Sequence, residues 1–384
     1  MITSPTLLVD QEKVIRNIKR MQAKAEKSQA EFRPHFKTHQ AAVIGEWFRP
    51  LGIEKIAASS LEMAAYFAAH NWFDITVAFP LNPLEFAAVN RLASSITLNI
   101  TISAMEAAQH LCAAKVNSVG CFIEVDTGYG RTGIDAADFD SVQRIIELLA
   151  ASPHQFKGFL AHAGDAYKAK GRDEIYAIYD NNIKLLAKLR ERFASDADEL
   201  TISYGDTPSC SIVERLEVVN ELRPGNFVFY DITQMELGAC ELDDIAVAVA
   251  CPVVAVSEKR KEVIVHGGAV HLSKDYLERD DGQKSFGEVV ALDSTGWRVD
   301  QALGYVSGIS QEYGIIKATD EFLATAKIGE LVAVLPIHSC LIADNMNRFT
   351  DLEGNVIIQR PKNIFSGPGA TEYGAGNIKF DDLP

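Results

Sequence analysis

Short apolar runs alternate with amphipathic segments along most of the first 235 residues, and this regularity is what most constrains the fold. The runs predict eight strands, each but the last followed by a helical segment. The first strand leads into Lys37, and the others are expected at residues 55–59, 74–79, 96–100, 120–126, 157–162, 200–204 and 217–222. Eight such repeats are typical of a closed parallel (β/α)8 barrel. The alternative, an open doubly wound sheet, lacks its Gly-x-Gly-x-x-Gly fingerprint after the first strand.

After about residue 235 the helical periodicity largely ends. Valine-rich runs at residues 246–256 and 262–270 predict strands, and shorter ones are expected at residues 288–292, 303–307, 331–335 and 355–359. A chain of 384 residues is also long enough for two or three domains. We expect a barrel domain over residues 1–235, whose first few residues could belong to the second domain, and a mostly β domain over residues 236–384.

The charge balance argues against several classes of partner. The chain has 37 basic and 52 acidic residues, a net charge of −15, whereas nucleic acid and anionic membranes need a basic patch. Its 6 cysteines are scattered without close pairing, which is typical of a reducing compartment. Neither a signal peptide nor an apolar run of membrane-spanning length is visible, so we expect a cytoplasmic protein.

The stretch Arg33-Pro34-His35-Phe36-Lys37-Thr38-His39 is the first candidate for chemistry. A lysine becomes an amine nucleophile when burial or nearby cationic groups lower its pKa, and Arg33, His35 and His39 are close to Lys37 in sequence. That environment suits a lysine that forms a Schiff base. On local sequence alone, an ordinary surface lysine at a strand end is the more common case.

Further candidates lie at the expected carboxyl ends of strands, where parallel barrels place their functional loops. Arg131, in a glycine-rich turn, could hold an anionic oxygen or simply pair with Asp126 or Asp135. Residues 203–209 are small and turn-rich enough to cradle a phosphate, although an ordinary loop would look the same. His162 ends an apolar strand, where a buried structural histidine is the usual case.

His338 and Cys340 follow the apolar run at residues 331–335. Alternation along a strand would place both side chains on one face, and imidazole together with thiolate favours zinc. Two protein ligands leave room for substrate oxygens, as a catalytic metal requires. In most proteins, however, a histidine and a cysteine at a strand end have no such role.

Together these motifs resemble those of the alanine-racemase-like (fold type III) pyridoxal-phosphate enzymes, most closely the D-serine dehydratase and D-threonine aldolase family. The matching segments keep the family's order: residues 6–10, 33–39, 126–133, 203–208, 221–231 and 338–340. The resemblance implies pyridoxal 5′-phosphate bound to Lys37 through a Schiff base at the C-terminal mouth of the barrel. It also implies a zinc ion on His338 and Cys340 near the cofactor, and a homodimer to which the β-domain contributes.

The resemblance further implies roles for single residues. Arg131 would approach the phenolic oxygen of the cofactor ring, and His162 would face the cofactor or the substrate. Arg223 could meet the pyridine nitrogen, as an arginine of similar context does in alanine racemase. The phosphate site would be lined by Ser203, Gly205, Thr207, Gly225 and Asn226.

The implied substrate is a small D-amino acid with a β-hydroxyl group. In a D-serine dehydratase, Lys37 removes the α-proton and zinc makes the hydroxyl a better leaving group, which yields pyruvate and ammonia. In a D-threonine aldolase, a base such as His162 takes the hydroxyl proton and the Cα–Cβ bond breaks. The His-x-Cys pair favours the dehydratase, although residues 341–344 are not the threonine-rich run expected of either enzyme.

Two other functions stay open. An amino-acid racemase would need a second base, for which Tyr305 and Tyr313 are available. A non-catalytic pyridoxal-phosphate carrier would resemble the barrel but would lack residues 236–384.

Overall fold

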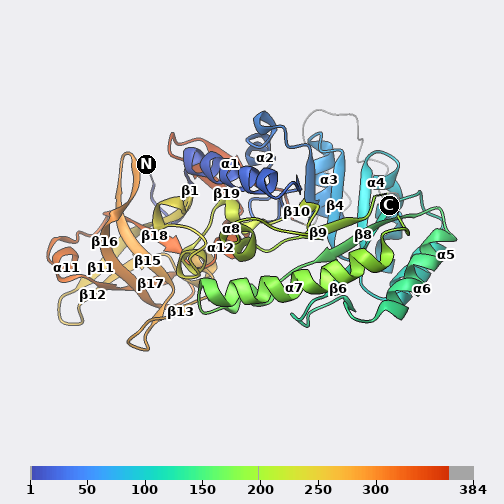
Figure 1. The fold of residues 1–384 in the computed structure, drawn as a ribbon. Coiled ribbons are helices and arrows are strands. Elements are labelled where there is room, and N and C mark those ends of the chain that lie inside the picture. Colours follow the sequence, from blue (N-terminus) through green and yellow to red (C-terminus); the bar gives the residue numbers. More distant parts are fainter. Residues whose placement is uncertain (1, 198, 363–384) are drawn as a thin grey trace. The chain divides into compact units, whose positions relative to one another are not determined.

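The computed structural model describes residues 2–197 and 199–362, which divide into two compact units. One unit contains residues 21–225 and the described residues from Arg360 onward. The other contains the described residues up to Arg20 together with residues 226–359. Each unit is built around its own large sheet (Figure 1). Among the described residues, every helix is too short or too polar to cross a membrane.

Eight parallel strands form the sheet of the first unit, which we call the barrel unit. Their order is β2-β10-β9-β8-β6-β5-β4-β3, and a parallel bridge between His35 and Ala57 joins the segment after β2 to β3. This bridge closes the sheet, and the predicted parallel barrel is confirmed. The strands are β2 Glu31–Phe32, β3 Lys55–Ala58, β4 Asp74–Pro80, β5 Thr97–Ile102, β6 Gly120–Asp126, β8 Gln155–Ala161, β9 Thr201–Tyr204 and β10 Glu221–Leu222, with the short β7 Ile134–Asp135 paired to β6.

Helices follow most of these strands, as the alternating pattern predicts. At the start of α6, Asp138 accepts a hydrogen bond of 3.0 Å from the N–H of Ser141, which satisfies a free donor of the first turn. Four apolar residues of α6 are buried at helical spacing, from Val142 to Leu149. The helices are α1 Gln11–Lys27, which crosses the boundary between the units, then α2 Ala42–Glu46, α3 Leu61–Ala69, α4 Phe86–Ala93, α5 Met105–Ala113, α6 Phe139–Ala150, α7 Arg172–Phe193 and α8 Thr207–Ile212.

A buried ionic network ties several barrel strands together. Arg33, only 4% exposed, donates from Nε to Glu221 Oε2 at 2.6 Å and from Nη1 to Asp74 Oδ1 at 2.7 Å. Ser203 donates its hydroxyl to Glu221 Oε1 at 2.7 Å. Burial alone would raise the pKa of Glu221, but the charge of Arg33 and these hydrogen bonds outweigh it, so the pKa lies below its usual value. The buried carboxylate is therefore ionised and fully paired.

The second unit, which we call the β-rich unit, has a nine-stranded sheet in the order β12-β17-β16-β15-β18-β11-β1-β19-β20. β12 also pairs with β11, so the six strands from β12 to β11 close into a ring. The mostly β second region is confirmed. Within residues 236–362, β13, β14, β17 and β19 are additions to the predicted strands. The strands are β1 Thr6–Val9, β11 Val247–Ser257, β12 Glu262–His266, β15 Gly287–Asp293, β16 Gly296–Ile309, β17 Tyr313–Ala318, β18 Leu331–Pro336, β19 Arg348–Asp351 and β20 Val356–Ile358, with the hairpin β13 Leu277–Glu278 and β14 Lys284–Ser285.

The predicted strand geometry at His338 and Cys340 is wrong. β18 ends at Pro336, and His338 is the N-cap of helix α12, so Cys340 is the second residue of a helix. The reason is a long-range contact, because the carboxylate of Asp231 accepts the N–H of Ser339 at 3.0 Å and stabilises the first turn of the helix. The helices of this unit are α9 Ile232–Glu236, α10 Ala269–Leu272, α11 Asp320–Thr325 and α12 Ser339–Met346.

Candidate active site

Lys37 lies in the turn that follows β2 and the bridge at His35, so the first strand ends earlier than expected. Phe36 anchors this turn: its ring packs 4.9 Å from those of Phe48, Phe67 and Trp72. Every residue from 33 to 42 is buried except Lys37, which is exposed. The turn therefore holds an accessible amine on a rigid apolar base.

His162 follows β8, and its ring is held in one orientation. Its Nδ1 contacts the carbonyl of Gly205, which can only accept, so the ring proton is on Nδ1 and Nε2 carries a lone pair. Burial, and then the positive charge of Lys37, lower the pKa of His162 to about 3. Burial and the charge of Lys37 also lower the pKa of His35. Both imidazoles are therefore neutral, and the charge of Lys37 acts on both.

The guanidinium of Arg223, which follows β10, is held by hydrogen bonds to residues of β8 and β9. Its Nε donates to the hydroxyl of Ser203 at 2.8 Å, and its Nη2 donates to the carbonyl of Ala161. Ser203 also donates to Glu221, so its hydroxyl group forms hydrogen bonds with both side chains. The sequence assigned Ser203 to a phosphate site, and the structure shows its side chain positioning Arg223.

The other predicted phosphate-site residues of the barrel unit lie in the loops after β9 and β10. A Cβ atom on Gly205 would lie 2.7 Å from the carbonyl oxygen of Arg223, and one on Gly225 would lie 3.0 Å from that of His35. Glycine is needed at Gly205 because the backbones approach so closely there. Thr207 begins α8, and its N–H donates to the hydroxyl of Tyr167 at 3.1 Å.

Arg131 lies on the loop after β6 and is half exposed. Its Nη2 is 3.9 Å from Glu124 Oε1, and its guanidinium carbon is 5.5 Å from the centroid of the Tyr129 ring. Asp126, one of the predicted pairing partners, instead accepts the N–H groups of Gly128 and Gly130. The positive charge of Arg131 reaches His162, which places both in one region of the barrel unit.

His338 and Cys340 come together in the β-rich unit. The side chain of His338 interacts with Cys340, and its Nδ1 lies 3.3 Å from Asp275 Oδ2. Burial alone would lower the pKa of His338, but Asp275, Cys340 and Asp231 raise it to about 11. A carboxylate on Nδ1 leaves Nε2 as the ligand atom, the arrangement that orients histidines in zinc sites. The pair therefore has the donor types of a zinc site, and zinc bound to Nε2 would displace the proton that this nitrogen carries.

Asn226 belongs to this same group in the β-rich unit. Its amide donates to Asp231 Oδ2 at 2.7 Å and to the hydroxyl of Ser339 at 2.9 Å, and it lies 3.5 Å from the sulfur of Cys340. Asp231 and Asp275 support the pair but have no role in the sequence analysis. Asp231 ends the matching segment 221–231, which was a usable signal, whereas nothing in the sequence marks Asp275.

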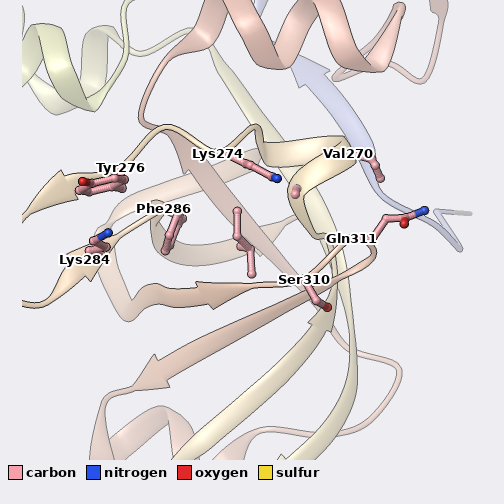
Figure 2. Close-up of a pocket in the computed structure, with 9 residues that line it drawn as sticks. Val270, Lys274, Tyr276, Lys284, Phe286, Ser310 and Gln311 are labelled. Atoms are coloured by element: carbon pink, nitrogen blue, oxygen red, sulfur yellow. The ribbon is translucent and has the colours of Figure 1, made fainter.

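A cavity of about 630 Å³ lies in the β-rich unit (Figure 2). Lys274 and Tyr276, which flank Asp275 in the chain, line it together with Lys284, Phe286 and other residues. The ammonium group of Lys284 lies 4.0 Å from the centroid of the Tyr276 ring. Two ammonium groups on mostly apolar walls suit a small ligand that carries a carboxylate.

The barrel, its exposed lysine and its glycine-lined loops define a class of protein, and comparison with known families confirms it. The family model for the alanine racemase N-terminal domain matches residues 9–232, more than half of the chain, and a serine dehydratase domain model matches residues 246–350. The chain belongs to the alanine racemase N-terminal domain family. Its fold is that of the fold type III pyridoxal-phosphate enzymes.

Particular relatives are dehydratases and aldolases, which are lyases. D-serine dehydratase of Dictyostelium discoideum is 27% identical over 367 residues, which cover 89% of this chain and 91% of that protein. D-threo-3-hydroxyaspartate dehydratase of Delftia sp. (strain HT23) is 26% identical over 351 residues, covering 88% and 91%. The structure of the Delftia enzyme matches with a TM-score of 0.86 at 24% identity, over 94% of this chain and 98% of that chain. D-threonine aldolase from Filomicrobium marinum shares the fold, with a TM-score of 0.76 at 19% identity over 94% and 97%.

Proposed function

We propose that this chain is a pyridoxal-phosphate-dependent lyase that acts on small β-hydroxy D-amino acids, with the conversion of D-serine to pyruvate and ammonia as its reaction. The observation that carries the proposal is the exposed Lys37, held among buried residues and beside two neutral histidines. The named dehydratases that align with nine tenths of the chain support the reaction type.

The residues of the barrel unit fit the cofactor. Lys37 supplies the amine for its aldehyde. The close approach of Gly205 to the backbone of Arg223 sets the position of the loops after β9 and β10, which are predicted to hold the phosphate. Arg131 supplies a charge-assisted donor for a ring oxygen. Pyridoxal 5′-phosphate would supply an electron sink for the charge left at Cα. The contribution of Ser203, Thr207, Gly225 and Asn226 to the phosphate site stays a prediction.

We assign the proton transfers of the reaction to two side chains of the barrel unit, Lys37 and His162. We assign the removal of the proton from Cα to Nζ of Lys37, because Lys37 is the one exposed side chain among the buried residues 33–42. His162, with Nδ1–H fixed by Gly205, offers only Nε2 to a substrate hydroxyl. His35, whose Nδ1 accepts the N–H of Lys37 at 3.3 Å, holds the turn in place.

We further propose that His338 and Cys340 hold zinc through Nε2 and Sγ. A solved variant of D-threo-3-hydroxyaspartate dehydratase in the metal-free form has a cysteine changed to alanine, and a second variant has a histidine changed to alanine two residues earlier. The spacing is the same as that of His338 and Cys340. Zinc would act as a Lewis acid toward the leaving hydroxyl group.

The second candidate function is a D-threonine aldolase-type cleavage, which the unprotonated Nε2 of His162 favours, because that reaction needs a base for the β-hydroxyl. A racemase receives less support. The hydroxyl of Tyr305 donates to Gln283 at 2.8 Å, and Arg279 lies 4.1 Å from the centroid of its ring. The homodimer and the cytoplasmic location stay predictions from the sequence.

The test is a product assay on purified protein loaded with pyridoxal phosphate and zinc. D-serine should yield pyruvate and ammonia in equal amounts, and Cys340→Ala should lose this activity. Cys112→Ala, a change at another half-buried cysteine, is the matched control and should keep it. Glycine and acetaldehyde from D-threonine, with no pyruvate from D-serine, would replace the dehydratase by the aldolase. An intact cofactor band without product from either substrate would refute the substrate class.

A further inference from the structure

Two histidines and a glutamate converge in the β-rich unit away from the residues assigned so far. His266 ends β12, His271 belongs to α10, and Glu312 lies in the turn between β16 and β17. Their ligand atoms all lie within 4.8 Å of one another. Nε2 of His266 is 3.8 Å and Nε2 of His271 is 3.9 Å from the same carboxylate oxygen, Oε2 of Glu312. Three separate segments thus bring their ligand atoms close together.

The backbone around these donors is tightly fixed. The N–H of Gly267 donates to the carbonyl of Glu312 at 2.8 Å, and the N–H of Ala269 donates to that of Ser310 at 2.8 Å. A Cβ atom on Gly268 would lie 2.5 Å from the carbonyl oxygens of both Ser310 and Gln311. Only glycine lets α10 pack this closely on the turn, and this packing sets the spacing of the three side chains.

We propose that His266, His271 and Glu312 form a second zinc site, separate from His338 and Cys340. Two imidazoles and one carboxylate are a ligand set that zinc uses with a fourth position open to water, whereas magnesium and calcium prefer oxygen donors. Donors around a tetrahedral zinc lie roughly 3.3 Å apart. The two imidazole–carboxylate spacings therefore need to close by about half an ångström, and the imidazole–imidazole spacing, which is at most 4.8 Å, by at most about 1.5 Å.

The surroundings give an ion a path to the three donors. Side-chain exposures of 37% for His266 and 47% for Glu312 give a metal a path from solvent, while His271, at 16%, is more enclosed. Zinc on Nε2 puts the ring proton on Nδ1, so the 3.3 Å contact from the N–H of Gly268 to Nδ1 is exchanged for the metal bond.

The consequence is local. The ion would join the end of β12 and helix α10 to the β16–β17 turn, three segments that otherwise meet through backbone hydrogen bonds. Val270 of α10 and Ser310 and Gln311 of the turn also line the cavity of Figure 2, so zinc would stiffen one wall of that cavity.

The experiment measures zinc bound per full-length chain after dialysis, by elemental analysis. We expect two equivalents in the unaltered protein, one in His271→Ala, one in Cys340→Ala and none in the double variant. Glu312→Gln should also lose one equivalent. Glutamine is close to glutamate in size and Glu312 is more exposed than His271, so this variant tests the site even if His271→Ala does not fold. His110→Ala, at an exposed histidine of α5, is the matched control and should keep both.

Cobalt substitution assigns each ion. The His271→Ala variant should keep a thiolate-to-cobalt charge-transfer band, because its remaining ion is bound by Cys340, and Cys340→Ala should lose it. If both His271→Ala and Glu312→Gln bind as much zinc as the unaltered protein, the second site does not exist. If His338 and Cys340 bind no zinc, the unaltered protein binds one equivalent, and losing it in His271→Ala would still support the second site.

Discussion

Replacing Glu221 by glutamine tests whether burial decides the strength of the ionic network in the barrel. The pair Arg33–Glu221 and the pair Lys55–Glu31 have the same N–O distance, 2.6 Å. The side chains of the first pair are 4% and 3% exposed, and those of the second are 38% and 57% exposed. The N–O distance is therefore matched, whereas the burial of the two pairs differs strongly.

The expected costs follow from what each change leaves behind. Glu221→Gln leaves the buried guanidinium of Arg33 without one of its two carboxylates, and removing one partner of a buried pair costs about 3–5 kcal/mol. Asp74 still holds Nη1 at 2.7 Å, so the lower end, about 3 kcal/mol, is expected. Glu31→Gln exposes Lys55 to water and should cost less than about 1 kcal/mol.

Urea unfolding followed by tryptophan fluorescence measures both. Of the chain's 3 tryptophans, Trp47 and Trp72 lie in the barrel unit, so the signal reports mainly on that unit. With an m-value of about 3 kcal/mol per molar urea, Glu221→Gln should lower the midpoint by about 1 M, and Glu31→Gln by less than about 0.3 M. Equal shifts in the two variants would refute the argument from burial.

Three further predictions concern the barrel unit. Burial lowers the pKa of His39 from 6.5 to about 3. Below pH 6.5, His39 therefore binds a proton in the unfolded chain but stays neutral in the folded chain. His39 should therefore cost about 2 kcal/mol of stability between pH 7.5 and pH 5, and His39→Leu should lose this part of the decline in urea midpoint; an unchanged decline would contradict it. Gly205→Ala, whose Cβ would lie 2.7 Å from the carbonyl oxygen of Arg223, should weaken pyridoxal-phosphate binding at least about tenfold in an absorbance titration. Gly308→Ala, with its nearest neighbour at 3.7 Å, should bind it normally, and equal affinities would argue against the cradle. Lys37→Ala should abolish the absorbance band of the Schiff base, whereas Lys55→Ala on β3 should retain it; a retained band in the first variant would move the linkage to another amine.

The resemblance of scattered motifs identified the family, but it could not show which atoms of each residue are free. Ser203 illustrates this limit of sequence reasoning. Its position in the matching segment predicts a phosphate contact, and only the structure shows that its hydroxyl also bridges Glu221 and Arg223. His162 shows the opposite case. The sequence pointed to it, and the carbonyl of Gly205 then fixed which of its two nitrogens can act.

Local patterns determined the barrel, because each βα repeat encodes its own strand, cap and buried helical face within about twenty-five residues. The same locality made Lys37 visible, since its buried neighbours from 33 to 42 are also its neighbours in sequence. Tertiary structure alone decided the rest. β1 pairs with β11 although residues 10–246 separate them in the chain, and Asp231 turns the expected strand at His338 into the start of a helix. Glu312 meets His266 and His271 only because a turn of the β-rich unit folds onto α10. These contacts join residues that are far apart in sequence. The periodicity of apolar residues reports only on neighbours in the chain, so it cannot predict such contacts.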